Sequence, residues 1–183
     1  EQALSLHPAQ PIALAGVAYL LHSTQGATAC ATFCREQLDQ GRVCEELYRF
    51  LVMSRTQERR YQDAVKAADE GLAQFGDSAW LHIRRAHAIK HLDRAAAIAD
   101  GRRAVELAPT LAEAHETKGQ MLSHGTASPE LLEESLVAFA QQIQLAPGTG
   151  KAYLNAAVVL MRLGRSDESL EKMRQVVARV PTW

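Results

Sequence analysis

The sequence of 183 residues is poor in several features that mark particular classes of protein. Only 5% of the residues are aromatic and alanine is abundant, which favours closely packed helices over a β-sandwich of aromatic and β-branched side chains. A formal net charge of −1 provides no overall attraction to nucleic acid or to an anionic membrane. We therefore predict no nucleic-acid partner. The 47% hydrophobic content is sufficient for a sizeable core.

Long apolar runs are also missing. The longest run, residues 11–21, is too short to span a bilayer as a helix. Its length would suit a signal peptide, but the segment before it contains Glu1 and neither Lys nor Arg, and a signal peptide requires a basic region there. We predict no membrane span and no signal peptide.

Cysteines are few: Cys30, Cys34 and Cys44. An odd number without a disulfide-like framework is typical of a reducing compartment, so we predict a cytoplasmic protein, with the periplasm and the secreted side as alternatives. Together with His22 the cysteines supply four candidate zinc ligands, but their spacing lacks the paired knuckles of zinc sites, and cysteine is often simply buried. We predict no metal and no cofactor, and the role of the three thiols stays open.

A triplet of residues recurs along the chain at a regular interval. It consists of a small residue, a second residue four positions later that is usually bulky, and Pro or Gly eight positions after that. The small residue allows a neighbouring helix to approach closely, and Pro or Gly ends the helix. The triplets are Ala29, Phe33 and Gly41; Ala64, Ala68 and Gly76; Ala97, Gly101 and Pro109; Ser135, Phe139 and Pro147; Ser169, Met173 and Pro181. Successive triplets begin 35, 33, 38 and 34 positions apart, and a period near 34 predicts repeated helix pairs.

A second apolar-periodic segment precedes each triplet and is long enough for a helix. The third of these segments contains Trp80-x2-Ile83, and the first contains Gly16-x2-Tyr19. With the triplets, these residues resemble the tetratricopeptide repeat (TPR), whose pattern is W-x2-L-G-x2-Y, then A-x3-F, then P. The second-helix part of the pattern is well kept, whereas no unit carries the whole first-helix part. The resemblance implies an all-α fold, a right-handed α-α superhelix of antiparallel helix pairs.

The repeats divide the chain into one array over residues 1–183. We predict helix pairs at 10–42, 43–76, 77–109, 110–147 and 148–181. Residues 1–9, with Ala3 to Pro8, match the last turn of a preceding repeat, and no polar capping helix follows Pro181. Because solenoid ends need caps for solubility, we expect a piece of a longer protein, or ends covered by a partner or by a second copy.

Motifs that carry catalysis are not found. The segment Pro147 to Ala152, "PGTGKA", lacks two defining positions of a phosphate-binding loop, since Leu145 stands in place of Gly and Ala152 in place of Ser or Thr. His87 and His91 are four residues apart, which suits two metal ligands, but no convergent third ligand accompanies them. We predict no catalytic residue and a non-enzymatic protein.

The candidate binding surface follows from the resemblance, which implies that the first helices line a concave groove. On the third first helix, helical spacing selects the face of Leu81, Arg85 and Ala88. The predicted partner-binding residues of the groove are Val17, Arg49, Met53, Arg85, Glu116, Gln120, Lys151, Leu154, Asn155, Val158 and Met161. The lining is apolar at both ends and polar in the middle, which predicts a protein or peptide partner with acidic groups and apolar anchors. Arg49 and Arg85 are the predicted carboxylate ligands.

The predicted function is a scaffold that holds a partner segment in this groove. One alternative is the repeat region of a larger enzyme, such as a transferase or hydroxylase, that recruits substrate proteins. Another is a scaffold that forms homo-oligomers through its uncapped ends. Lys151 and Asn155 alone match the Lys and Asn positions of the family's carboxylate-clamp subset, so we do not predict binding of chaperone tails.

Overall fold

The computed structural model describes residues 10–179, which form ten α-helices and no strand. The helices are α1 (Gln10–Gln25), α2 (Ala27–Asp39), α3 (Glu45–Gln57), α4 (Tyr61–Phe75), α5 (Ala79–Ile89), α6 (Arg94–Leu107), α7 (Ala112–Ser123), α8 (Pro129–Leu145), α9 (Gly150–Arg162) and α10 (Ser166–Arg179). Each of the five predicted segments contains two of them. The predicted all-α class is confirmed. The two predicted array ends lie outside the described residues.

The contacts within the chain divide it into two compact units, with the boundary between Asp93 and Arg94. Unit 1 contains α1 to α5, and unit 2 contains α6 to α10. The boundary therefore falls inside the segment 77–109, between its two helices. Among the described helices, none combines the length and the apolar character that a membrane span needs.

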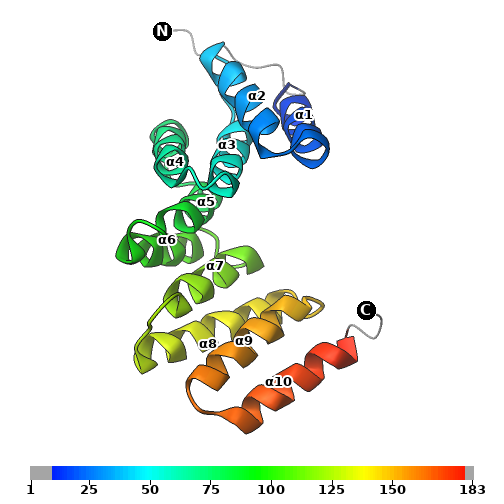
Figure 1. Ribbon diagram of the computed structural model, residues 1–183, viewed down its shortest axis with the longest axis vertical. Coiled ribbons are helices and arrows are strands. Elements are labelled where there is room, and N and C mark those ends of the chain that lie inside the picture. The colour runs from blue at the N-terminus through cyan, green and yellow to red at the C-terminus, as the bar shows by residue number, and fades with distance from the viewer. Residues whose placement is uncertain (1–9, 180–183) are drawn as a thin grey trace. The chain divides into compact units, whose positions relative to one another are not determined.

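Helix α3 is the central element of unit 1, where it contacts α1, α2, α4 and α5 (Figure 1). Its side chains Leu47, Leu51 and Val52 are buried in the core of the unit. Small residues bring α4 close to its neighbours, since a Cβ atom added at Gly71 would lie only 3.0 Å from the side chain of Tyr48. The first helices α1, α3 and α5 thus form one layer, and α2 and α4 pack against it.

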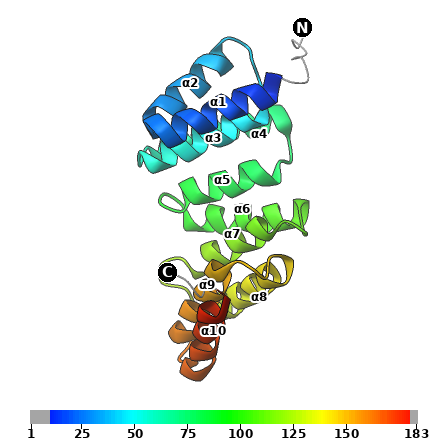
Figure 2. The ribbon, with the colours of Figure 1, turned by 90° about the vertical axis from the view of Figure 1, so that its right-hand side faces the viewer.

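Unit 2 is built from consecutive helix contacts, from α6 with α7 to α9 with α10, and α7 also contacts α9 (Figure 2). Phe139 of α8 is 1% exposed and lies against Gly119 of α7. The small residues of the last two triplets also make polar contacts, because the Ser135 hydroxyl donates to the carbonyl of Gly119 at 2.9 Å and the Ser169 hydroxyl donates to that of Ala157 at 2.8 Å. The triplet residues therefore hold the second helices against the first helices by packing and hydrogen bonds.

Three helices end in the same hydrogen-bonded turn, with the second residue after the helix in a left-handed conformation. Gly41 follows α2 with φ 79° and Gly164 follows α9 with φ 75°. After α3 the same place is taken by Arg59, with φ 60°, and the Arg60 amide donates to the carbonyl of Arg55 at 2.9 Å. An L-residue adopts this conformation at a cost that glycine avoids.

Candidate partner-binding site

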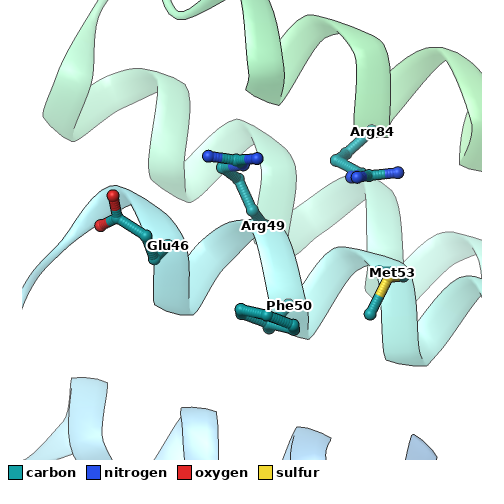
Figure 3. Close-up of a pocket in the computed structure, with 5 residues that line it drawn as sticks. All are labelled: Glu46, Arg49, Phe50, Met53 and Arg84. Atoms are coloured by element: carbon teal, nitrogen blue, oxygen red, sulfur yellow. The ribbon is translucent and has the colours of Figure 1, made fainter. Parts of the chain in front are cut away.

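A cavity of about 260 Å³ opens on the α3–α5 face of unit 1. It is lined by Glu46, Arg49, Phe50 and Met53 of α3 and by Arg84 of α5, and Figure 3 shows the five side chains around it. The four residues of α3 are spaced i, i+3, i+4 and i+7, so they share one helix face. The cavity is smaller than a typical pocket for a small-molecule ligand, and its size suits one or two side chains of another chain.

Arg49 is held in place by an aromatic contact. Its guanidinium carbon lies 4.2 Å from the centre of the Trp80 ring, which is a cation–π geometry. Such a contact contributes roughly 0.5–1 kcal/mol at a partly exposed site and restricts the arginine side chain. Arg49 therefore presents a positioned group of N–H donors to the cavity.

The chemistry of the cavity is cationic with apolar walls. Arg49 and Arg84 contribute two positive charges against the single negative charge of Glu46, and Phe50 and Met53 provide apolar surface. Guanidinium groups bind carboxylates through paired hydrogen bonds, and these strengthen when the surroundings exclude water. The arrangement can bind a carboxylate that stands beside an apolar side chain.

Two of the residues that were expected to line the groove on α5, Leu81 and Ala88, are buried, whereas the role of Arg85 stays a prediction. Leu81 and Ala88 are both 0% exposed, so the face that they share with Arg85 is turned into the protein. The Arg85 guanidinium forms an ion pair with Asp69 of α4 at 2.5 Å, and Arg84 is the arginine of α5 that lines the cavity. Helix α5 lacks the Gly and Tyr that mark the first helix in the family pattern, so the sequence identifies its faces less clearly.

Two other lining residues, Glu46 and Phe50, were not predicted either. The helical spacing of α3 could have identified both, since Glu46 lies three residues before Arg49 and Phe50 lies one residue after it on the same helix face. Val17 of α1 is 42% exposed but does not line this cavity. It belongs to an apolar face of α1 on which Ile12, Tyr19 and Leu20 are exposed as well.

The predicted polar residues of unit 2 bond to one another around Glu116. The Lys151 ammonium lies 2.6 Å from its carboxylate, the Gln120 amide donates to it at 2.9 Å, and the Gln142 amide donates to it at 3.0 Å. Gln142 is 2% exposed, so part of this network is buried. The polar side chains in the middle of the predicted surface thus bond largely to one another within unit 2.

The predicted apolar residues of α9 form an exposed stripe. Leu154, Val158 and Met161 are exposed and lie at i, i+4 and i+7 on one side of the helix. Asn155 is half-buried, and its side-chain nitrogen has no hydrogen-bond partner within residues 10–179. Unit 2 therefore exposes an apolar surface on α9, whereas the side-chain nitrogen of Asn155 is buried.

The three cysteines are free and buried in unit 1. The hydrogen bond with Cys30, together with burial, raises the pKa of the Cys34 thiol, and burial raises the pKa of Cys44. Within the described part of the chain, no group of three or more His, Cys, Asp or Glu side chains could hold a metal ion. The thiols contribute to the core of unit 1.

Solved structures of TPR proteins are similar to this chain. TTC0263 of Thermus thermophilus, a thermophilic TPR protein, matches with a TM-score of 0.78 at 15% identity, over 94% of this chain and 92% of that chain. MamA from residue 41 to its end, of Desulfovibrio magneticus RS-1, matches with a TM-score of 0.74 at 15% identity, over 93% and 95%. YrrB, described as a TPR protein with an unusual peptide-binding site, matches with a TM-score of 0.66 at 21% identity, over 98% and 91%.

No protein-family model and no curated protein sequence matches the chain. At identities this low, the structural matches demonstrate the fold alone. They confirm the predicted TPR-like solenoid, which the period near 34 residues had indicated from the sequence.

Proposed function

We propose that this chain, which has the TPR-repeat fold, is a non-enzymatic scaffold that binds a segment of a partner protein. The observation that carries the proposal is the cavity of unit 1, where Arg49 and Arg84 stand beside Phe50 and Met53. The partner segment carries an Asp or Glu next to an apolar residue. The carboxylate bonds to the two guanidinium groups, and the apolar side chain packs on Phe50 and Met53.

Rigidity supports this function. Arg49 is restrained by Trp80, and α3 is anchored in the core by Leu47, Leu51 and Val52. A site that is already ordered loses little conformational entropy when it binds an extended segment, so more of the contact energy appears as affinity. YrrB supports the same class of function, since it is described as having a peptide-binding site.

The experiment is selection of peptides from a random display library on the full chain, followed by affinity measurement with the selected peptides. We expect them to combine an acidic residue with a neighbouring Leu, Ile, Met or aromatic residue. Arg84→Gln should weaken binding by tenfold or more, because it removes a charge-assisted hydrogen bond. Higher salt should also weaken binding, because the contact is electrostatic.

Arg85→Gln is the matched control, one residue along the same helix. Its guanidinium pairs with Asp69 outside the cavity, so affinity should stay within about twofold of the wild type. Equal losses from Arg84→Gln and Arg85→Gln would refute the assignment of the cavity. Selected peptides without acidic residues would refute the proposed partner chemistry.

Self-association is a second candidate function, favoured by the exposed apolar face of α1. Ile12 is 77% exposed, Tyr19 62% and Leu20 59%, and apolar surface of this kind often marks an interface. Sedimentation at several protein concentrations tests it, with Tyr19→Lys as the variant. A strictly monomeric wild-type protein removes this candidate.

For localisation we propose the cytoplasm, on the ground that three free buried thiols suit a reducing compartment.

A further inference from the structure

Unit 1 has a second cavity, of about 240 Å³, on the α2–α4 side of α3. Its charged lining consists of the cations Arg35, Arg55, Arg60 and Lys66 and the acids Asp63 and Glu70. The side chains come from α2, α3 and α4 and from the turn before α4, so cations converge from three directions. This cavity takes no part in the proposed partner-binding site.

The two cavities lie on opposite faces of α3. Arg55 lines the second cavity, and at about 100° per residue it lies about 180° around the helix from Glu46 of the first. The two cavities share no lining residue, and Leu51, which lines the second, is buried. A ligand in one cavity therefore leaves the other accessible.

The charges of the second cavity differ from those of the first. The lining of the second cavity has four cations and two acids, whereas that of the first has two cations, one acid and apolar walls. The complement of the first is a carboxylate beside an apolar group. The complement of the second is a compact anion with several acceptor oxygens.

Internal ion pairs occupy only part of the cationic lining. Arg35 pairs with Glu70 at 2.9 Å and with Asp39 at 3.8 Å, Arg60 pairs with Asp63 at 2.6 Å, and Arg55 pairs with Glu58 at 2.8 Å. Asp39 and Glu58 lie outside the lining. A guanidinium group has five N–H donors, so a carboxylate partner leaves donors for a second anion.

Lys66 differs from the three arginines. It is exposed, and within residues 10–179 its ammonium group makes no ion pair with any acid. Its ammonium group is therefore available to a ligand, and it adds three N–H donors that can rotate toward one.

We propose that this cavity binds a dianionic phosphate group. A phosphate monoester carries nearly two negative charges near neutral pH and presents three strong acceptor oxygens, which match the ammonium group of Lys66 and the N–H donors that the arginines direct to the cavity. A carboxylate offers half the charge and only two oxygens. A volume of 240 Å³ holds a phosphorylated side chain or free phosphate, whereas drug-sized ligands occupy larger pockets.

The test is titration of the full chain with inorganic phosphate and with N-acetyl-phosphoserine amide, followed by NMR chemical shifts of backbone amides at pH 7.5. Acetate at the same ionic strength is the monoanion control. We expect both phosphates to shift amides of α2, α3 and α4, and acetate to leave them unchanged. Tighter binding of the phosphoserine compound indicates a phosphorylated partner chain as the source, and tighter binding of inorganic phosphate indicates a free anion.

Lys66→Gln is the decisive variant, because it removes the cation that has no internal partner and leaves the ion pairs of the arginines intact. It should reduce phosphate affinity at least tenfold. Arg84→Gln, in the other cavity, should leave phosphate affinity unchanged, and this separates the present proposal from the proposed function. At pH 5, where the phosphoserine compound is mainly a monoanion, its affinity should fall. Shifts of equal size with acetate, or phosphate binding unaffected by Lys66→Gln, would overturn the proposal.

Discussion

The contact between Gly119 of α7 and Phe139 of α8 allows a sharp test of the packing of unit 2. Phe139 is 1% exposed, and a Cβ atom added at Gly119 would lie 2.6, 2.8 and 2.9 Å from three atoms of its ring. Ordinary contacts between carbon atoms are about 3.5–4.0 Å, so the ring would have to move by about 1 Å. The two positions should therefore be strongly coupled.

We expect Gly119→Ala to lower the free energy of unfolding of the wild type and to raise that of the Phe139→Ala variant. Phe139→Ala alone should lower the free energy of unfolding by roughly 3–5 kcal/mol, because it leaves a cavity between helices. Gly119→Ala alone should lower it by about 1–3 kcal/mol through overpacking. In the Phe139→Ala background the clash is gone and alanine is the better helix former, so Gly119→Ala should raise the free energy of unfolding by about 1 kcal/mol. The coupling between the two substitutions is then about 2–4 kcal/mol.

Urea unfolding followed by circular dichroism measures the four proteins of this cycle, and equal slopes against urea show that the same unfolding is compared. Gly16→Ala is the matched control, since Gly16 of α1 has no atom within 4 Å of the added Cβ. It should stabilise the protein by about 1 kcal/mol in both backgrounds. If Gly119→Ala destabilises the Phe139→Ala protein as much as the wild type, the packing described for α7 and α8 is incorrect.

Three further predictions concern a turn, a loop and an ion pair. Arg59→Gly should raise the free energy of unfolding by about 0.5–1 kcal/mol, because glycine relieves the left-handed conformation; a lower urea midpoint would contradict this. Arg162→Ala removes a donor to the carbonyl of Gly125 at 2.7 Å, so amide hydrogen exchange in the α7–α8 turn should accelerate while exchange in α4 does not change. Hydrogen bonding from Arg102 lowers the pKa of the Glu134 carboxyl in the folded protein. The ionised carboxylate therefore stabilises the fold fully above its ordinary pKa near 4.5, and this stabilisation is lost as the pH falls through the lower folded pKa. Glu134→Gln should reduce stability at pH 7 and flatten the acid decline below pH 4.5, and an unchanged acid decline would argue against the pair.

The second helices were more predictable than the first helices. Their small residue, bulky residue and stop residue are recognisable in the sequence, and the structure buries Ala64, Ala97, Ser135 and Ser169 at the first of these positions. A small buried residue at a helix crossing is set by local geometry, so it repeats with the period of the array. Its polar contacts were not predictable, because the carbonyl that accepts from Ser135 belongs to another helix.

The candidate site was predicted only in part. Arg49 and Met53 line the cavity together with Arg84, which was not predicted, and Arg85 pairs with Asp69 of α4. Similarly, the acceptor for Lys151 and Gln120 is Glu116, and the pairing leaves little polar capacity for a partner there. A residue type and a helix face can be inferred from periodicity, whereas the partner of a long charged side chain cannot.

Periodicity and composition were enough to establish that the chain forms helix pairs and which small residues lie between them. These properties depend on backbone conformation and on hydrophobic spacing, which act over one or two helical turns. Only the folded arrangement decides which arginines line a cavity, which carboxylates they pair with, and that two cavities with different linings occupy opposite faces of α3. Those outcomes depend on distances between helices, and a side chain several ångströms long can reach an acid on either neighbour.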